Sequence, residues 1–207
     1  MTEIAEIAPG IRHWATFHPG IRQTVHSHWV PEARVVLDPM APAGLLEALR
    51  KGPSPDRVVL TNRHHYRDSD RLAAELGCGV LCPESGLHEF ERGREVEGYA
   101  YGDDVAPGIT AHEVGAICPD DAALHIGVGP GALAFADAVI RWDGELAFVP
   151  DFLMDDPERT KRGIVESLRR LLELEFDVLL FAHGEPLVGG AREALAEFVA
   201  SPRTAGF

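Results

Sequence analysis

Two apolar runs of almost the same sequence constrain the fold of this chain more than any other feature. They are Arg34-Val-Val-Leu-Asp38 and Arg57-Val-Val-Leu-Thr61. Each run is short, rich in β-branched residues and bounded by polar residues, which is typical of a buried strand. Because the similarity does not extend beyond these runs, we interpret them as two neighbouring strands of the core and not as an internal repeat.

The rest of the chain contains many predicted strands and several predicted helices. Apolar runs bounded by turn residues predict strands, and apolar residues at helical spacing predict helices. Strands are expected over residues 11–17, 23–30, 79–82, 109–114, 122–128, 132–135, 139–142, 146–149 and 177–181, and helices over residues 44–51, 69–76, 159–175 and 191–200. Residues 84–108 are charged and glycine-rich, so they are expected to form a long excursion with one helical turn near residues 87–91. No low-complexity linker divides the 207 residues, and a single α/β domain with a layered core, residues 1–207, is the expectation.

Charge and cysteine content bound the environment of the protein. The formal net charge is −14, which argues against binding to nucleic acids or to anionic membrane surfaces, because both need a basic face. The 3 cysteines are too few and of the wrong parity for a disulfide framework. The first residues lack a basic segment followed by an apolar one, and no run approaches the roughly 18 apolar residues of a membrane helix. We therefore expect a cytoplasmic protein with no nucleic acid or membrane partner.

Polar groups follow three predicted buried strands directly. They are the segment 62–68, Asp137 and His183. Strand ends fix the backbone while the following loop opens to solvent, and imidazole with carboxylate suits a borderline ion such as zinc. The alternatives remain that His183 is a hydrogen-bonded structural residue and that Asp137 caps a turn or pairs with an arginine.

The residues around these groups resemble the motifs of the metallo-β-lactamase superfamily. In that family a hydrophobic strand runs into Thr-His-x-His-x-Asp-His, and Pro-Gly-His-Thr-Pro, a Gly-Asp after a strand and a final His-Gly follow downstream. Residues 57–68 resemble the first motif, and residues 181–186 (FAHGEP) resemble the last. The resemblance spans most of the chain and implies an αββα four-layer sandwich with its site along the edge between two sheets.

The resemblance to the first motif is partial. Thr61 and His64 match its threonine and its second histidine, whereas Asn62 stands at the position of the first histidine. Tyr66 replaces the motif aspartate, and Arg67 replaces the histidine that follows it. By resemblance, His64 is a candidate metal ligand, and the other three are substitutions at ligand positions.

The later motifs are also incomplete. Ile117 replaces the ligand histidine, whereas Asp137 fits the bridging aspartate and His183 the final histidine. Asp38 fits an aspartate that supports the metal-binding loop in the family. Each of the two family metal sites therefore keeps at most two protein ligands, Asp137 with either His64 or His183. A catalytic zinc normally has three protein ligands.

Nearby side chains offer replacements for the lost ligands. His65, Asp68 and His112 are close in sequence to the lost positions. Arg67 offers the opposite solution, because a guanidinium near Asp137 or Asp68 would fill the space of the second metal and balance the charge. The expected cofactor is either none or one weakly bound divalent cation, most simply zinc.

Two further histidines alternate along a predicted strand. His26 and His28 therefore face the same side of that strand. Exposure to solvent is the favoured interpretation of this pair, and a role in lining a pocket is the alternative.

Two functions remain open at this point. The first is a non-hydrolytic binding or scaffold protein that uses the cleft of a degenerate metal site for a small-molecule ligand. The second is a hydrolase for an ester, thioester or lactone, with one atypical metal held by His64, Asp137, His183 and a replacement ligand. The zinc content of the purified protein distinguishes the two. The apolar content of residues 17–33 and 84–108 is also compatible with a homodimer.

Overall fold

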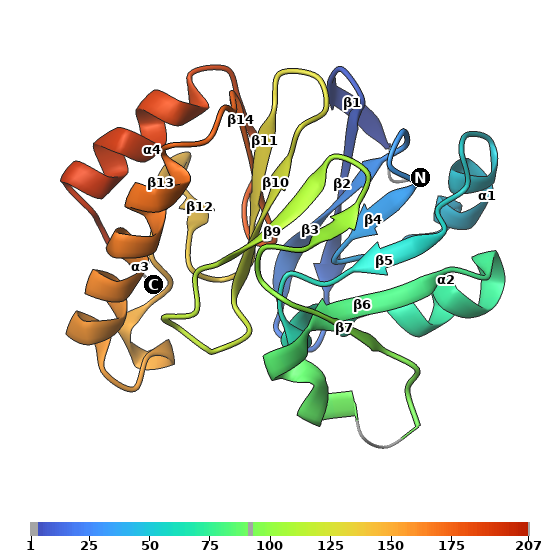
Figure 1. The fold of residues 1–207 in the computed structure, drawn as a ribbon, viewed down its shortest axis with the longest axis horizontal. Helices are drawn as coiled ribbons and strands as arrows, with labels where there is room; N and C mark the ends of the chain where they lie inside the picture. Colours follow the sequence, from blue (N-terminus) through green and yellow to red (C-terminus); the bar gives the residue numbers. More distant parts are fainter. Residues whose placement is uncertain (1–3, 91–92, 207) are drawn as a thin grey trace.

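Two β-sheets pack face to face between two layers of helices in the computed structural model, which describes residues 4–90 and 93–206 (Figure 1). In Figure 1, α1 (Leu45–Arg50) and α2 (Ser69–Leu76) lie on the right, the two sheets in the middle, and α3 (Pro157–Leu171) and α4 (Ala191–Ala200) on the left. This arrangement confirms the αββα four-layer sandwich that the sequence resemblance implies. Apolar side chains from both sheets fill the space between them.

The first sheet has seven strands that follow one another in chain order. The first four pair antiparallel, and the last four pair parallel. The two similar apolar runs form β4 and β5, which are neighbouring strands as predicted, and Val36 lies beside Val58 in their parallel register. The strands are β1 (Ala5–Ala8), β2 (Ile11–His18), β3 (Gln23–Val30), β4 (Val35–Leu37), β5 (Arg57–Val59), β6 (Gly79–Pro83) and β7 (Glu97–Tyr99).

The second sheet has six strands in the order β15-β14-β11-β10-β9-β8. Only β11 and β14 pair parallel within it, among the described residues. A separate hairpin, β12 with β13, turns at Asp143-Gly144, where both residues have positive φ as the sequence signal requires. The bounds are β8 (Asp104–Ala106), β9 (Ile109–Glu113), β10 (Ala122–Ile126), β11 (Ala132–Phe135), β12 (Ile140–Trp142), β13 (Glu145–Ala147), β14 (Val178–Phe181) and β15 (Leu187–Val188).

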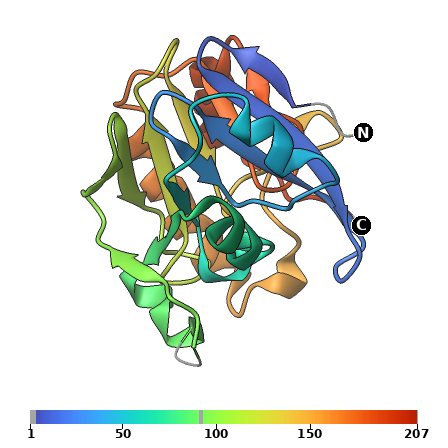
Figure 2. The same cartoon turned by 90° about the vertical axis from the view of Figure 1, so that its right-hand side faces the viewer.

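The helices cover the outer faces of the sheets. α1 (Leu45–Arg50) and α2 (Ser69–Leu76) lie over the first sheet and face the viewer in Figure 2. α3 (Pro157–Leu171) and α4 (Ala191–Ala200) cover the second sheet. Burying the Ile164 or Leu168 side chain of α3 contributes about 1.5–3 kcal/mol each, and their spacing explains why the helix is predicted from sequence. The helix ends at Leu171 and not at residue 175 as expected. None of the helices in the described ranges is long and apolar enough to span a membrane.

The segment 84–108 is more regular than the sequence suggests. It contains the 3₁₀ segment η2 (Glu84–Phe90), where the helical turn was expected, and the strands β7 and β8. Residue 91, the end of that predicted turn, lies outside the described residues. β7 extends the first sheet and β8 the edge of the second, so the segment connects the two sheets. Strands of three residues are too short to show a periodicity, which is why sequence analysis missed them.

Candidate metal centre

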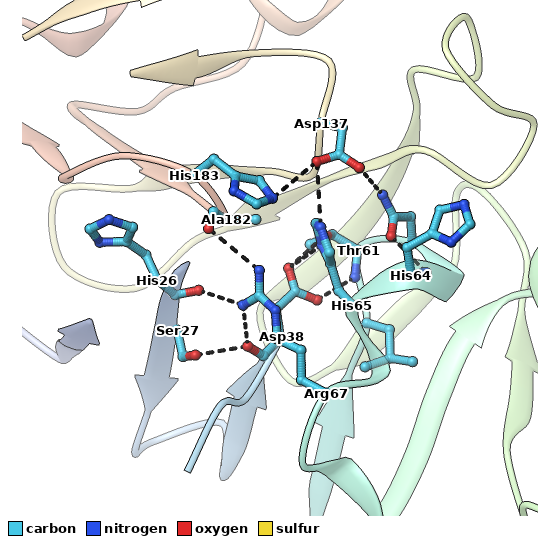
Figure 3. A network of polar contacts seen from close by, with 12 residues as sticks. His26, Ser27, Asp38, Thr61, His64, His65, Arg67, Asp137, Ala182 and His183 are labelled. Carbon is cyan, nitrogen blue, oxygen red and sulfur yellow. Dashed lines mark hydrogen bonds and ion pairs between the residues drawn. The ribbon is translucent and has the colours of Figure 1, made fainter. Parts of the chain in front are cut away.

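Polar side chains follow the carboxyl ends of strands at one edge of the sandwich. Asp38 follows β4, and residues 61–67 follow β5, its parallel neighbour. Asp137 follows β11, and His183 follows β14, its parallel neighbour in the second sheet. Each pair of parallel strands ends at one edge, and the facing sheets bring these edges together (Figure 3).

Asp137 is the meeting point of this cluster. Its Oδ1 lies 3.4 Å from Nε2 of His65 and 3.4 Å from Nε2 of His183. Its Oδ2 accepts a hydrogen bond of 2.7 Å from Nδ2 of Asn62. Burial alone would raise the pKa of the Asp137 carboxyl, but the charges and contacts of the two histidines hold it well below its usual range.

His65 lies between two carboxylates. Its Nδ1 is 3.1 Å from Oδ2 of Asp38 and 3.0 Å from Oγ1 of Thr61, while its Nε2 faces Asp137. Burial would lower its pKa, but the charges of Asp137 and Asp38 outweigh burial and raise the pKa to about 9. His65 is therefore an imidazolium near neutral pH when no other cation is bound.

Asp38 is held in place by Thr61, which follows the neighbouring strand β5. The backbone N of Thr61 donates to Oδ1 of Asp38 at 2.8 Å, and the Thr61 hydroxyl donates to Oδ2 at 2.5 Å. Asp38 has a φ of 45°, in the left-handed region that non-glycine residues rarely adopt. Strained backbone of this kind tends to persist at functional sites, where the surrounding contacts fix it.

Within residues 4–90 and 93–206, Arg67 binds backbone carbonyls and not a carboxylate, which corrects the sequence expectation. Its guanidinium donates to the carbonyl oxygens of His26 at 2.9 Å, Asp38 at 2.7 Å and Ala182 at 3.4 Å. These carbonyls come from β3, from the residue after β4 and from the residue after β14, so Arg67 ties the two sheets together (Figure 3). Burial lowers the pKa of the Arg67 guanidinium, and the charges of Asp38 and Asp137 oppose this shift.

His64 lines the same cleft as Asp137 and His183 but lies exposed at its wall. Asn62 caps the 3₁₀ segment η1 (Arg63–Tyr66) by accepting a hydrogen bond of 2.9 Å from the backbone N of His64. In this short turn His65 points inward and is buried. The structure therefore brings His65, one of the replacement ligands proposed from sequence, to Asp137.

The remaining sequence candidates lie elsewhere. Asp68 accepts a hydrogen bond of 2.7 Å from the backbone N of Ala41 and so anchors a loop. Tyr66 packs beneath the Arg94 guanidinium, 4.4 Å from the ring centroid. His112 lies on β9 beside His125, with ring centroids 6.3 Å apart. Ile117 does line the cleft, as an apolar wall.

The cleft above the cluster has a volume of about 1220 Å³. Both arginines on its wall are engaged. Arg63 forms an ion pair with Asp120, and Arg141 donates to the carbonyl of Pro186 at 2.7 Å. Apolar side chains make up much of the wall, among them Ile21, Ile117, Ile140, Trp142, Val149, Phe152 and Leu153.

His26 and His28 are buried, so the interpretation of this pair as exposed is wrong. Each is 3% exposed, because the face of β3 that carries them packs against the end of β14. The backbone N of His26 donates to the carbonyl of Ala182 at 3.0 Å, and Nε2 of His28 lies 3.2 Å from the carbonyl of Phe181. Alternation alone does not reveal whether a second sheet covers that face.

Two groups of side chains have the geometry to hold a metal ion, among the described residues. His65, Asp137 and His183 each offer one ligand atom, and these atoms lie within 4.8 Å of one another. His13, His26 and Glu185 form a second such group. Two imidazole nitrogens with one carboxylate oxygen are a donor set that suits zinc and leaves a coordination position open.

The sequence matches no family model and no curated protein, but solved structures match over nearly the whole chain. It is similar to a metallo-β-lactamase family protein from Thermus thermophilus, at 17% identity and a TM-score of 0.66, over 94% of this chain and 80% of that one. A B3 metallo-β-lactamase with an active-site glutamic acid matches at 15% identity and a TM-score of 0.65, over 94% and 86% of the two chains. The flavodiiron core of a protein from Synechocystis sp. PCC6803 matches at 14% identity and a TM-score of 0.64, over 96% of this chain and 61% of that one.

Proposed function

Since the chain has the metallo-β-lactamase fold, we propose that it is a metal-dependent hydrolase with one divalent cation held by His65, Asp137 and His183. The proposal rests on Oδ1 of Asp137, which faces the Nε2 atoms of both histidines. The two N···O distances of 3.4 Å exceed the usual 2.7–3.2 Å of N–H···O hydrogen bonds. They are close to the ~3.3 Å that separates two ligand atoms of a tetrahedral zinc with bonds of about 2.0–2.1 Å.

The surroundings of these side chains support the same proposal. Metal-binding histidines usually direct their second ring nitrogen at a carboxylate, and Nδ1 of His65 faces Asp38 in this way. Asn62 holds one oxygen of Asp137 and leaves the other for the cation. When bound, a divalent cation would polarise a substrate carbonyl and lower the pKa of a water molecule.

The residues of the chain have separate roles in this proposal. Asp38 fixes the ring of His65 and favours a proton on Nδ1, so that Nε2 is free to act as a ligand once His65 has lost its second proton. Because that proton has a pKa of about 9, it competes with the cation at neutral pH. Metal affinity is therefore moderate at pH 7 and increases with pH.

The cleft favours a neutral carbonyl substrate with an apolar group. Much of the wall is apolar, and Arg63 and Arg141 are already engaged with protein partners. An anionic substrate such as a phosphodiester is recognised best by free cationic side chains. We therefore propose an ester, thioester or lactone as the substrate class.

One observation favours a second candidate, a non-hydrolytic protein that binds a small molecule in the cleft. The carboxylates of Asp38 and Asp137 are already balanced by the cations His65 and Arg67. A centre of this kind is stable without a metal ion, since paired charges avoid the cost of an isolated buried charge.

The experiment that decides between the two is metal analysis combined with hydrolysis. The protein is dialysed against dilute Zn²⁺ and then against buffer, and zinc is measured by elemental analysis. Hydrolysis of a p-nitrophenyl ester, an acyl thioester and a lactone is measured on the same samples. We expect zinc at this centre and hydrolysis in the wild type, loss of both in His65→Asn and His183→Asn, and retention of both in His64→Asn, the matched control at the exposed neighbour. A wild type that binds no zinc and hydrolyses none of the substrates would favour the binding protein.

A further inference from the structure

Three histidines lie side by side on the inner face of the first sheet, and the proposed centre uses none of them. His13 of β2 pairs directly with His28 of β3, and His26 is two residues from His28 on the same face. All three are buried, with exposures of 8% for His13 and 3% for the other two. Buried imidazoles are costly unless their nitrogens are bonded, so this group needs an explanation beyond packing.

The hydrogen bonds of the group are incomplete. Nε2 of His13 lies 2.9 Å from Nδ1 of His26, and their rings are stacked with centroids 5.1 Å apart. One of the two rings therefore donates its N–H to the nitrogen of the other. Nδ1 of His28 is buried and forms no hydrogen bond with any residue in the described ranges.

A carboxylate lies within reach of the His13–His26 pair. Glu185 follows β14 in the same loop as His183 and is exposed. Its carboxylate and one nitrogen from each of His13 and His26 all lie within 4.8 Å of one another. Glu185 and His26 both line the cleft, so an ion in solution can reach the pair.

We infer that His13, His26 and Glu185 form a second cation site beside the proposed centre, for a borderline ion such as Zn²⁺ or Co²⁺. The cation would replace the proton between the two imidazoles. The N···N distance has to open only from 2.9 Å to about 3.3 Å for a tetrahedral site. Two histidines and one glutamate form a set that leaves a position open toward the cleft.

The site is distinct from the proposed centre, and Arg67 explains the separation. The Arg67 guanidinium binds the backbone carbonyls of His26 and Ala182, so a permanent cation occupies the space beneath His183. In Figure 3 the His26 ring lies beyond His183, on the side away from His64. A second cation is thereby directed to the His13–His26 pair, where Glu185 supplies the negative charge.

The test counts metal equivalents in the full-length protein. Co²⁺ and Zn²⁺ are titrated by equilibrium dialysis with elemental analysis, and the visible spectrum of Co²⁺ reports the ligand environment. We expect two equivalents in the wild type. Glu185→Gln, which changes an exposed side chain, and His13→Asn should each weaken the second equivalent by at least roughly 10–100-fold and leave the first unchanged. Glu193→Gln, an exposed glutamate of α4, is the control and should retain both.

The outcomes separate this inference from the proposed function. His65→Asn should lose one equivalent and retain the one that depends on Glu185. If the wild type binds a single equivalent that His65→Asn abolishes, or if Glu185→Gln binds both equivalents with unchanged affinity, the second site does not exist. If a single equivalent is lost in Glu185→Gln and kept in His65→Asn, the second site stands and the proposed centre fails. A wild type that binds no metal overturns both.

Discussion

Asn62 donates a hydrogen bond of 2.7 Å from Nδ2 to Oδ2 of Asp137, and this contact decides which oxygen of the aspartate faces the two histidines. The same side chain accepts from the backbone N of His64 through its Oδ1. Asn62, which stands where the metallo-β-lactamase motif has its first histidine, therefore supports Asp137 and caps the turn of residues 63–66. Asn62 itself is fully buried, and both contacts are partly shielded from water.

Replacing Asn62 by alanine should loosen Asp137 without removing a ligand. We expect a loss of about 1–3 kcal/mol in the free energy of unfolding, because a partly buried carboxylate oxygen and a helix-cap contact lose their partner. Zinc affinity should fall by roughly 10–100-fold, as for other residues that orient metal ligands. Urea denaturation and zinc titration check the two effects, and an unchanged zinc affinity would show that Asn62 does not orient Asp137.

Because His65 lies between two carboxylates, we expect the metal-free protein to lose stability at high pH. The pKa of His65 is raised to about 9, above the value of about 6.5 in an unfolded chain. Folding therefore favours the protonated form of His65. The contribution of this form to the free energy of unfolding is fully present below pH ~6.5 and is lost as the pH rises through 9. The shift corresponds to about 3 kcal/mol. Urea midpoints with a chelator should fall between pH 7 and pH 10, and His65→Gln should abolish this dependence.

Because β2 and β3 carry three buried histidines, we expect the protein to lose stability also at low pH. Burial lowers the pKa of His13 to about 4 and those of His26 and His28 to about 3. Below pH ~6.5 the unfolded chain binds protons at these positions that the folded chain does not, so stability falls as the pH falls. Three protons correspond to a slope of roughly 4 kcal/mol per pH unit. Circular dichroism should show unfolding within a few pH units below 6.5, and His28→Gln should make the transition shallower. Equal slopes in the two proteins would contradict this account.

Arg67 should be irreplaceable by lysine. Its guanidinium serves the carbonyls of His26, Asp38 and Ala182 at once, which a single ammonium cannot do with the same geometry. We expect Arg67→Ala to lower the free energy of unfolding by roughly 3 kcal/mol or more, and Arg67→Lys to recover less than half of that loss. Arg71→Ala, at an exposed arginine of α2, is the control and should shift the denaturation midpoint little. A lysine variant as stable as the wild type would mean that charge alone matters at this position.

The apolar pattern of the sequence predicts the buried strands of the structure and the polar residues that follow them. The runs ending at Asp38 and Thr61, and the strand before His183, bury continuous apolar segments, so their position and the polar residues after them follow from the sequence. The choice between His64 and His65 does not follow in this way. It depends on the cap that Asn62 gives to a turn of four residues, and a one-residue rotation exchanges the inward and outward histidine. The partners of Arg67 are backbone carbonyls from distant strands, which a motif alignment does not reveal.

Gly184 places His183, and its replacement by alanine should disable the proposed centre from outside the ligand set. Gly184 has a φ of 116°, and a Cβ at this position would lie 2.2 Å from the carbonyl oxygen of Arg141. Neither partner can give way easily, because the carbonyl of His183 accepts a hydrogen bond of 3.0 Å from the backbone N of Arg141. The loop must therefore move, and His183 moves with it. We expect Gly184→Ala to lose several kcal/mol of stability and most of its zinc affinity at this centre, whereas Gly189→Ala, where a Cβ meets open space, should show only the modest cost of a positive φ. Thermal denaturation with and without Zn²⁺ measures both effects, and a Gly184→Ala variant that binds zinc as the wild type does would show that His183 is not a ligand.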